Sequence, residues 1–180
     1  MSERSYRTRP FGPADRASGF RSGTRPLDDY FQRHALLNDQ GDVGRAYVLD
    51  ASAEDIEAGR LPAVVGFYTL SMAAVASRDV APVLARRLPG YPMPVALIGR
   101  LAVDERARGR RLGEALRVDA LARVVEASRL IACLGVVVDA KDAVAEAFYA
   151  KYDFVTVDDA SWPRRMFLPI DVARAAFDDN

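Results

Sequence analysis

The chain has 180 residues, half of which are apolar, and its 25 lysines and arginines balance its 25 aspartates and glutamates. This length predicts one domain with a substantial core, and no apolar run reaches the length of a membrane span, so we expect a cytoplasmic protein without a membrane segment. A single cysteine, Cys133, and a single histidine, His34, exclude an internal disulfide and a zinc cluster, so no metal is expected.

The N-terminal half of the chain alternates short strands and helices. Apolar residues recur at helical spacing from Leu27 to Leu36, and Gly41 and Gly44 follow as a stop, which predicts one helix there. In chain order we expect a strand at 6–11, a short helix at 13–20, that helix, a strand at 45–49, a polar loop at 50–62 and a long strand element at 63–76.

The C-terminal half continues the alternation with longer helices. Asp79 is expected to cap a helix that runs to Arg87, and a proline-rich loop at 88–94 leads to an apolar strand that ends at Val103. There follow a helix at 110–128, a strand at 132–138, a helix at 142–151, strands at 154–157 and 166–170, and a short helix after Asp171. Cys133, in its apolar run, is expected in the core, and His34 on a surface or helix face.

This order of elements predicts the fold class. Strands that alternate with helices after an antiparallel start favour an α/β (α+β) fold, with a central mixed, mostly antiparallel sheet flanked by helices. No repeat, linker or low-complexity segment interrupts the chain. Residues 1–180 are therefore expected to form a single domain.

The most informative segment is 97–116, in which an apolar run ends in an acidic turn and an arginine- and glycine-rich loop opens into a helix. Glycines let a backbone approach a ligand closely, and the first amides of a helix lack intrahelical partners. The helix dipole adds partial positive charge, so the element suits a phosphate group. Five arginines strengthen this tendency: Arg100, Arg106, Arg108, Arg110 and Arg111. The alternative is a surface loop whose arginines are simply solvated.

A second segment, 139–154, follows the apolar run 134–138 and predicts a short helix with Tyr149 near its end. A tyrosine there can serve as a proton donor. The alternative is a half-buried tyrosine that packs beside Phe148.

Together these segments resemble the GNAT superfamily of N-acyltransferases. The family's acyl-CoA loop reads Gln/Arg-x-x-Gly-x-Gly/Ala, and on this chain it begins at Arg108 and ends at Gly113, with Arg111 in place of the middle glycine. The resemblance implies acetyl-CoA as cosubstrate, held by the loop and by the main chain of the preceding strand. The residues it assigns to cofactor binding are Leu101, Ala102, Val103, Arg108, Gly109, Arg110, Arg111, Leu112 and Gly113.

The second segment resembles the family's strand, polar residue and short helix that ends Phe-Tyr-x-x-x-Gly-Phe. Tyr149 falls on the catalytic tyrosine, and Asp142 falls where many members carry an asparagine that binds the pantetheine arm. Asp153 replaces the family's glycine, so we expect an aspartate in a left-handed turn. We find no single convincing general base, since Asp104 and Glu105 are better explained as turn or surface residues.

Most of the chain, from about residue 11 to about 170, is similar to the GNAT-type toxins of bacterial toxin–antitoxin pairs. The resemblance implies acetylation of the α-amino group of aminoacyl-tRNA, a homodimer, and a ribbon-helix-helix antitoxin as partner. Two alternatives stay open: a GNAT enzyme that acts on a small amine or a protein N-terminus, and a catalytically inactive CoA-binding regulatory module.

Overall fold

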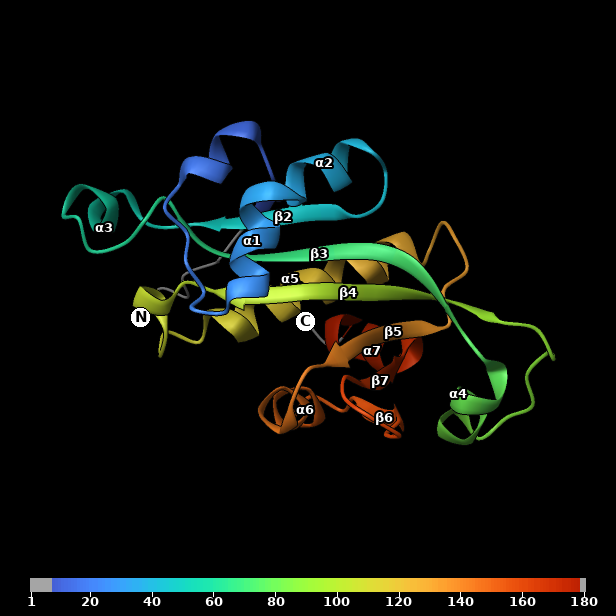
Figure 1. The fold of residues 1–180 in the computed structure, drawn as a ribbon. Helices are drawn as coiled ribbons and strands as arrows, with labels where there is room; N and C mark the ends of the chain where they lie inside the picture. Colours follow the sequence, from blue (N-terminus) through green and yellow to red (C-terminus); the bar gives the residue numbers. More distant parts are fainter. Residues whose placement is uncertain (1–7, 179–180) are drawn as a thin grey trace. The chain divides into compact units, whose positions relative to one another are not determined.

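The computed structural model describes residues 8–178, which hold one seven-stranded sheet in the order β1-β2-β3-β4-β5-β7-β6 together with helices (Figure 1). The strands are β1 (Thr8–Pro10), β2 (Arg45–Asp50), β3 (Val64–Val75), β4 (Met93–Val103), β5 (Gly135–Ala140), β6 (Val155–Asp158) and β7 (Arg164–Pro169). The α-helices are α1 (Arg25–Arg33), α2 (Ala35–Gln40), α3 (Ala53–Glu57), α4 (Ser77–Leu84), α5 (Leu112–Ala127), α6 (Ala143–Ala150) and α7 (Ile170–Asp178). Two 3-10 helices, η1 (Pro13–Ala17) and η2 (Glu105–Ala107), precede α1 and α5.

The sheet is mixed, as the sequence predicts. Strands β1 and β2, β2 and β3, β5 and β7, and β6 and β7 pair antiparallel, whereas β4 and β5 pair parallel with Ala96 opposite Val136. A parallel pair needs a long crossover, and α5 lies in the connection between these two strands. The predicted fold class is confirmed.

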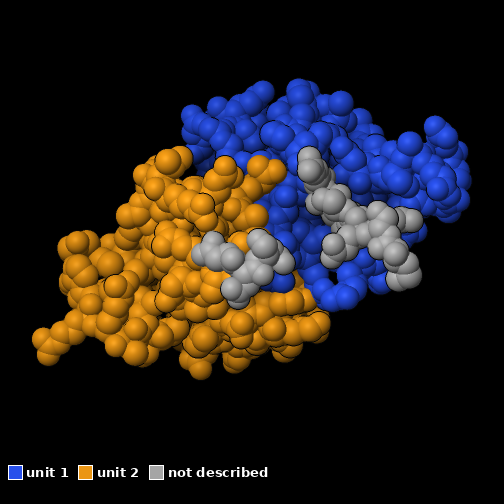
Figure 2. All heavy atoms as spheres, turned by 180° about the vertical axis from the view of Figure 1, so that it is seen from behind, with its two compact units in different colours: residues 1–70, 100–120 blue, residues 71–99, 121–180 orange. Residues whose placement is uncertain are grey.

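The described residues fall into two compact units (Figure 2). Unit 1 comprises residues up to 70 and 100–120, and unit 2 comprises 71–99 and the residues from 121 onward. The long elements β3, β4 and α5 contribute residues to both units.

Unit 1 has an aromatic core on one face of its strands. Phe20 and Phe31, with ring centroids 4.6 Å apart, pack with Phe67 of β3, and each of these side chains is at most 1% exposed. Because successive strand residues point to opposite faces, the neighbouring Gly66 faces the other side. There a Cβ on Gly66 would lie 2.8 Å from Leu116 of α5, so glycine is needed for α5 to pack this closely.

Unit 2 has a core of its own, to which α4 and strands β3, β4, β5 and β7 contribute. Its fully buried members include Val80 of α4, Val95 of β4, Val137 of β5 and Phe167 of β7. A Cβ on Gly135 would lie 2.3 Å from the Phe167 ring and 2.4 Å from the Leu168 carbonyl oxygen. Glycine at this position lets β5 and β7 pair.

Several local expectations were wrong. The predicted loop at 50–62 contains α3, whose N-cap Ser52 accepts a hydrogen bond from the Asp55 amide. The single helix predicted after Leu27 is interrupted at His34, so it forms α1 and α2. Helix α4 begins at Ser77 with Ala76 as its N-cap, so Asp79 lies in the first turn and does not cap it.

Other expectations were right only in part. The helix predicted at 13–20 is the shorter 3-10 helix η1, and Tyr6 of the predicted first strand lies outside the described residues. His34 is exposed as expected, but Cys133 is half-buried. The prediction of a single domain stays a prediction.

Within residues 8–178, we find no helix that is both long and apolar enough to cross a membrane.

Candidate active site

The loop between β4 and α5, in unit 1, has the backbone shape that the sequence predicts for phosphate binding. After Val103 the chain passes through η2, and Gly109 (φ 78°) and Arg111 (φ 59°) then take left-handed conformations before α5 begins at Leu112. Arg111 occupies the place where the GNAT pattern has glycine, and its positive φ shows why glycine is favoured there. The loop thus keeps the glycine-type conformation although the glycine is absent.

Asp104 organises the start of this loop. Its carboxylate is fully buried and accepts hydrogen bonds from the main-chain amides of Arg21 (2.9 Å) and Arg106 (3.0 Å) and from the Arg106 guanidinium (2.9 and 3.0 Å). Burial raises the pKa of Asp104, but the Arg106 guanidinium and the two amides lower it by more, so the pKa lies below its usual value. The two acids were expected to be turn or surface residues. Asp104 is a buried turn residue, and Glu105 is exposed.

The arginines of the loop are largely engaged with other parts of unit 1. Arg106 Nη2 donates to the Gly19 carbonyl oxygen (2.6 Å), and Arg108 Nη2 donates to that of Ser22 (2.6 Å). A Cβ on Gly23 would lie 3.2 Å from Arg108 Nη2, so the chain at 19–23 runs close against the loop. These two guanidinium groups therefore attach the loop to residues 19–22 and stabilise its conformation.

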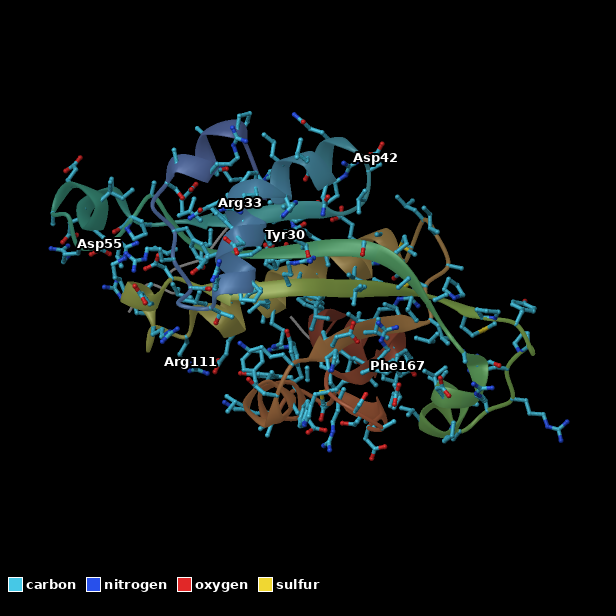
Figure 3. All side chains as sticks on the ribbon, viewed as in Figure 1. Tyr30, Arg33, Asp42, Asp55, Arg111 and Phe167 are labelled. Atoms are coloured by element: carbon cyan, nitrogen blue, oxygen red, sulfur yellow. The ribbon has the colours of Figure 1, made fainter. Side chains whose placement is uncertain are left out.

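The other three arginines have different partners, and Figure 3 labels one of the three, Arg111. The Arg100 guanidinium lies 3.7 Å from the centre of the Tyr30 ring, Arg110 donates to Asp55 (3.1 Å), and Arg111 donates to Glu114 (2.6 and 2.9 Å). The expectation of five arginines directed at a polyanion is therefore too simple. The side chains of Arg110 and Arg111 are still 41% and 79% exposed, which leaves N–H donors of both at the surface.

The end of β4 provides the strand that precedes this loop. Ala102 is buried, Leu101 and Val103 are half-buried, and the Asp104 amide pairs with the Val65 carbonyl of β3 (2.9 Å). An extended strand, a loop in left-handed conformation and the first turn of a 16-residue helix follow one another directly. This arrangement fits a pantetheine arm along the strand and phosphate groups at the helix N-terminus.

In unit 2, Asp142 caps helix α6. Its carboxylate accepts a hydrogen bond from the Ala145 amide (2.8 Å), which fixes where the helix begins after β5. This local role accounts for an aspartate at the position that the resemblance assigns to pantetheine binding. The assignment itself stays a prediction.

Tyr149 lies in the last turn of α6 and is 9% exposed. Its ring packs edge-on against Phe148 (5.1 Å between centroids) and against Phe154 (5.4 Å). The Phe154 amide returns to the Tyr149 carbonyl (3.3 Å), and this reversal needs the left-handed conformation of Asp153 (φ 66°). The expected left-handed turn is confirmed, and the ring of Tyr149 packs between its aromatic neighbours.

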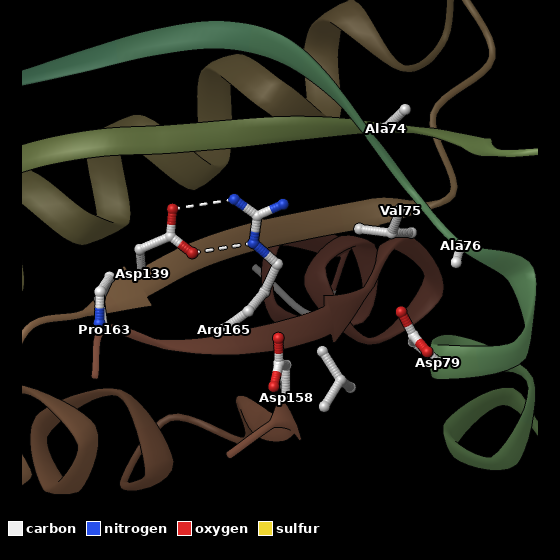
Figure 4. Close-up of a pocket in the computed structure, with 9 residues that line it drawn as sticks. Ala74, Val75, Ala76, Asp79, Asp139, Asp158, Pro163 and Arg165 are labelled. Atoms are coloured by element: carbon white, nitrogen blue, oxygen red, sulfur yellow. Dashed lines mark hydrogen bonds and ion pairs between the residues drawn. The ribbon is translucent and has the colours of Figure 1, made fainter. Parts of the chain in front are cut away.

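Unit 2 also contains a cavity of about 340 Å³ that the sequence analysis did not anticipate (Figure 4). It is lined by Ala74, Val75, Ala76, Asp79, Asp139, Val157, Asp158, Pro163 and Arg165. Asp139 and Arg165 are opposite each other in the β5–β7 pair and form two hydrogen bonds (2.8 and 2.9 Å), and this contact with Asp139 raises the pKa of Arg165. Three carboxylates against one guanidinium favour a cationic group over an anion.

The lining residues come from separate strands and from α4, so no spacing along the sequence could have revealed the cavity. Across residues 8–178, no three His, Cys, Asp or Glu side chains are grouped so that they could hold a metal ion.

The fold is that of the GNAT acetyltransferases. No protein-family model matches the chain. Among solved structures, a tyrosine-to-phenylalanine mutant of KacT superposes with a TM-score of 0.82 at 24% identity and covers 97% of this chain and 100% of its own. AtaT complexed with acetyl-methionyl-tRNAfMet superposes with a TM-score of 0.79 at 21% identity, over 95% of this chain and 98% of that one.

A sequence relative defines the family more narrowly. The chain is 39% identical over 146 residues to the tRNA-acetylating toxin of Mycobacterium tuberculosis (strain ATCC 25618 / H37Rv), across 81% of this chain and 82% of the relative. The protein therefore belongs to the tRNA-acetylating toxins, the GNAT-type toxins of bacterial toxin–antitoxin pairs. It is an acetyltransferase that uses acetyl-CoA.

Proposed function

We propose that this protein transfers the acetyl group of acetyl-CoA to the α-amino group of an aminoacyl-tRNA and so blocks translation. The observation that carries the proposal is the 39% identity to a tRNA-acetylating toxin over four-fifths of the chain. It is supported by the likeness in fold to AtaT, which is described in complex with acetyl-methionyl-tRNAfMet.

The chemistry of the acceptor suits the residues present. An α-amino group has a pKa of ~8, so part of it is already neutral at physiological pH and needs no strong base. Asp104 is unsuitable as a base, because its buried carboxylate is occupied by four hydrogen bonds and its pKa is lowered. Solvent water can accept the remaining proton.

The proposed roles fall to the main chain and loop of unit 1 and to Tyr149 of unit 2. Acetyl-CoA supplies an activated thioester. The main chain of Leu101, Ala102 and Val103 orients the pantetheine arm and polarises the thioester carbonyl, and the loop from Arg108 to Gly113 holds the phosphates. Tyr149 is the general acid that donates its phenolic proton to the departing thiolate, and its ring packs against Phe148 and Phe154.

We also propose the partners and setting that toxin–antitoxin pairs imply: a homodimer in the cytoplasm, neutralised by a ribbon-helix-helix antitoxin. AtaT is described bound to the C-terminus of its antitoxin AtaR, and KacTA is described in complex with DNA. A DNA-bound toxin–antitoxin complex is what a DNA-binding antitoxin would produce.

The experiment that tests the proposal compares acceptors with labelled acetyl-CoA. We expect label on aminoacyl-tRNA and none on the same tRNA after deacylation, because the deacylated tRNA lacks the α-amino group. Small amines and a peptide with a free N-terminus test the alternative acceptors in parallel. Equal or faster labelling of a small amine or of the peptide would refute the tRNA assignment. Absence of turnover with every acceptor would favour the inactive CoA-binding module.

A further inference from the structure

Helix α3 reaches the candidate phosphate loop through one ion pair. Asp55 of α3 is 8% exposed and accepts hydrogen bonds from Arg60 Nε (2.7 Å), Ser52 Oγ (3.0 Å) and Arg110 Nη1 (3.1 Å). Arg110 belongs to the loop, whereas Asp55 lies 55 positions earlier in the connection between β2 and β3. Both residues belong to unit 1, and Figure 3 labels Asp55 on α3.

The charges of Asp55, Arg60 and Arg110 together favour the binding of an anion. Hydrogen bonds from Arg60, Ser52 and Arg110 together lower the pKa of Asp55 to about 2 against the opposing effect of burial, with Arg60 contributing most, so the carboxylate is ionised at neutral pH. One carboxylate is then shared between two guanidinium groups. The second acid near Arg60, Glu54, has an 86% exposed side chain and makes no contact with Arg110.

Arg110 differs from the other arginines of the loop in how many of its N–H donors stay available to a ligand. Arg106 and Arg108 donate to the main-chain carbonyls of Gly19 and Ser22, and Arg111 pairs with Glu114 in the first turn of α5. Arg110 uses one of its five N–H donors for Asp55, and its side chain stays 41% exposed. A guanidinium held by one hydrogen bond is restricted in position and keeps its other donors for the oxygens of a phosphate.

We propose that Asp55 is a positioning residue for coenzyme A. It holds the Arg110 guanidinium at the loop, so that the remaining N–H donors bind a phosphate of the cofactor without first losing the rotational freedom of a long side chain. This inference rests on the proposed function, because it assigns the loop to acetyl-CoA. It adds α3, which the sequence analysis had assigned to a polar loop, to the residues that determine cofactor affinity.

The test measures coenzyme A binding by calorimetry, with no acceptor present. Charge-assisted hydrogen bonds are strong, so we expect Arg110→Gln to weaken binding about tenfold and Asp55→Asn to weaken it about fivefold. Asp55→Glu keeps the carboxylate and should restore most of the affinity. Glu54→Gln is the matched control, because Glu54 lies next to Asp55 in α3 and accepts a hydrogen bond from Arg60, and the variant should bind like wild type.

The double variant Asp55→Asn/Arg110→Gln decides whether Asp55 acts through Arg110. We expect it to bind no more weakly than Arg110→Gln alone, because both changes remove the same contact. In turnover assays Asp55→Asn should raise KM for acetyl-CoA and leave kcat unchanged. Repeating the titrations with 3′-dephospho-CoA shows which phosphate is bound: if Arg110 meets the 3′-phosphate, the variants lose their effect, and if it meets the pyrophosphate, the effect stays.

Three results would overturn the inference. Unchanged binding by Asp55→Asn together with weaker binding by Arg110→Gln would mean that Arg110 needs no positioning. Tighter binding by Asp55→Asn would mean that the carboxylate competes with phosphate. Additive losses in the double variant would mean that Asp55 acts elsewhere. Failure of the wild-type protein to bind coenzyme A would instead contradict the proposed function, so the two failures are distinguishable.

Discussion

The β4–α5 loop of unit 1 and the end of α6 in unit 2 both depart from the GNAT pattern at a glycine, yet they are held in different ways. The loop is fixed by side chains that bond to main-chain groups, among them Asp104, Arg106 and Arg108. The end of α6 is fixed by the packing of Tyr149 against Phe148 and Phe154. The first arrangement sets the path of a backbone, and the second sets the direction of one side chain.

The two positions at which this chain replaces a glycine of the family pattern share one backbone conformation. Arg111 and Asp153 both take left-handed conformations, with φ of 59° and 66°. The pattern therefore specifies a backbone conformation that glycine reaches most easily, and other residues reach it at some cost. The absence of these glycines is thus no argument for an inactive module, because the conformations that they favour are kept.

If the end of α6 acts through the Tyr149 side chain alone, removing its hydroxyl group should have the largest effect on turnover. Tyr149→Phe keeps the ring contacts, so we expect turnover to fall by ~10²–10⁴-fold, or about 3–5 kcal/mol of barrier, with acetyl-CoA affinity unchanged. Tyr152→Phe, three residues later, is the control and should keep turnover nearly intact. The measurement is acetyl transfer to aminoacyl-tRNA beside calorimetry. Full turnover by a folded Tyr149→Phe protein would refute the assignment.

The loop depends on Asp104 for stability, and this dependence should vary with pH. Asp104→Asn weakens hydrogen bonds to a buried charge, so we expect a loss of about 2 kcal/mol in the free energy of unfolding at pH 7. Because the folded-state pKa of Asp104 is lowered, its contribution is fully present above the unfolded pKa of ~3.9 and is lost as the pH falls through the folded value.

Urea unfolding of wild type and Asp104→Asn between pH 7 and pH 3 checks this expectation. The difference in unfolding free energy should stay constant down to about pH 5 and shrink below about pH 4. A difference that does not change over this range would mean that the carboxylate contributes no ionised hydrogen bonds.

If the loop binds through its backbone, a change that alters only the backbone should reduce affinity. Gly109 (φ 78°) and Gly59 (φ 66°) are both left-handed, and neither has an atom within 4 Å of an added Cβ. Valine at either position should therefore cost about 1–2 kcal/mol of stability. Gly109→Val alone should also weaken acetyl-CoA binding, by about tenfold or more, measured by calorimetry. Equal affinities of the two variants would contradict the loop assignment.

The smallest effects are expected at the replaced glycines themselves. Arg111→Gly relieves the left-handed strain but removes the ion pair with Glu114. Asp153→Gly replaces a residue that tolerates this conformation. The free energy of unfolding of both variants should therefore lie within about 1 kcal/mol of the wild-type value. Acetyl-CoA affinity of Arg111→Gly should change by less than about threefold, since the backbone conformation is kept. A loss above tenfold would make the Arg111 side chain itself a phosphate ligand.

Much of this protein could be predicted from local patterns in the sequence. The strand, loop and helix at 97–116 and the strand and helix at 134–151 were predicted with boundaries within a few residues of β4, α5, β5 and α6. Hydrophobic periodicity and capping residues act over one or two turns, so they are visible in the sequence. The left-handed turn at Asp153 could be recognised because the family pattern marks that position with glycine.

The contacts that give the site its character could not be predicted this way. Helix α3 was missed because five residues carry little periodic signal, and its role depends on Arg110, 55 positions away. The hydrogen bonds that Arg108 donates to Ser22 and Arg165 donates to Asp139 join strands and loops that are far apart in the chain. The sequence by itself determined the elements and the order of the motifs, because those follow from local spacing. The tertiary structure alone decided which arginines face the protein and which keep donors for a phosphate, because a guanidinium takes the partner that folding brings within its reach.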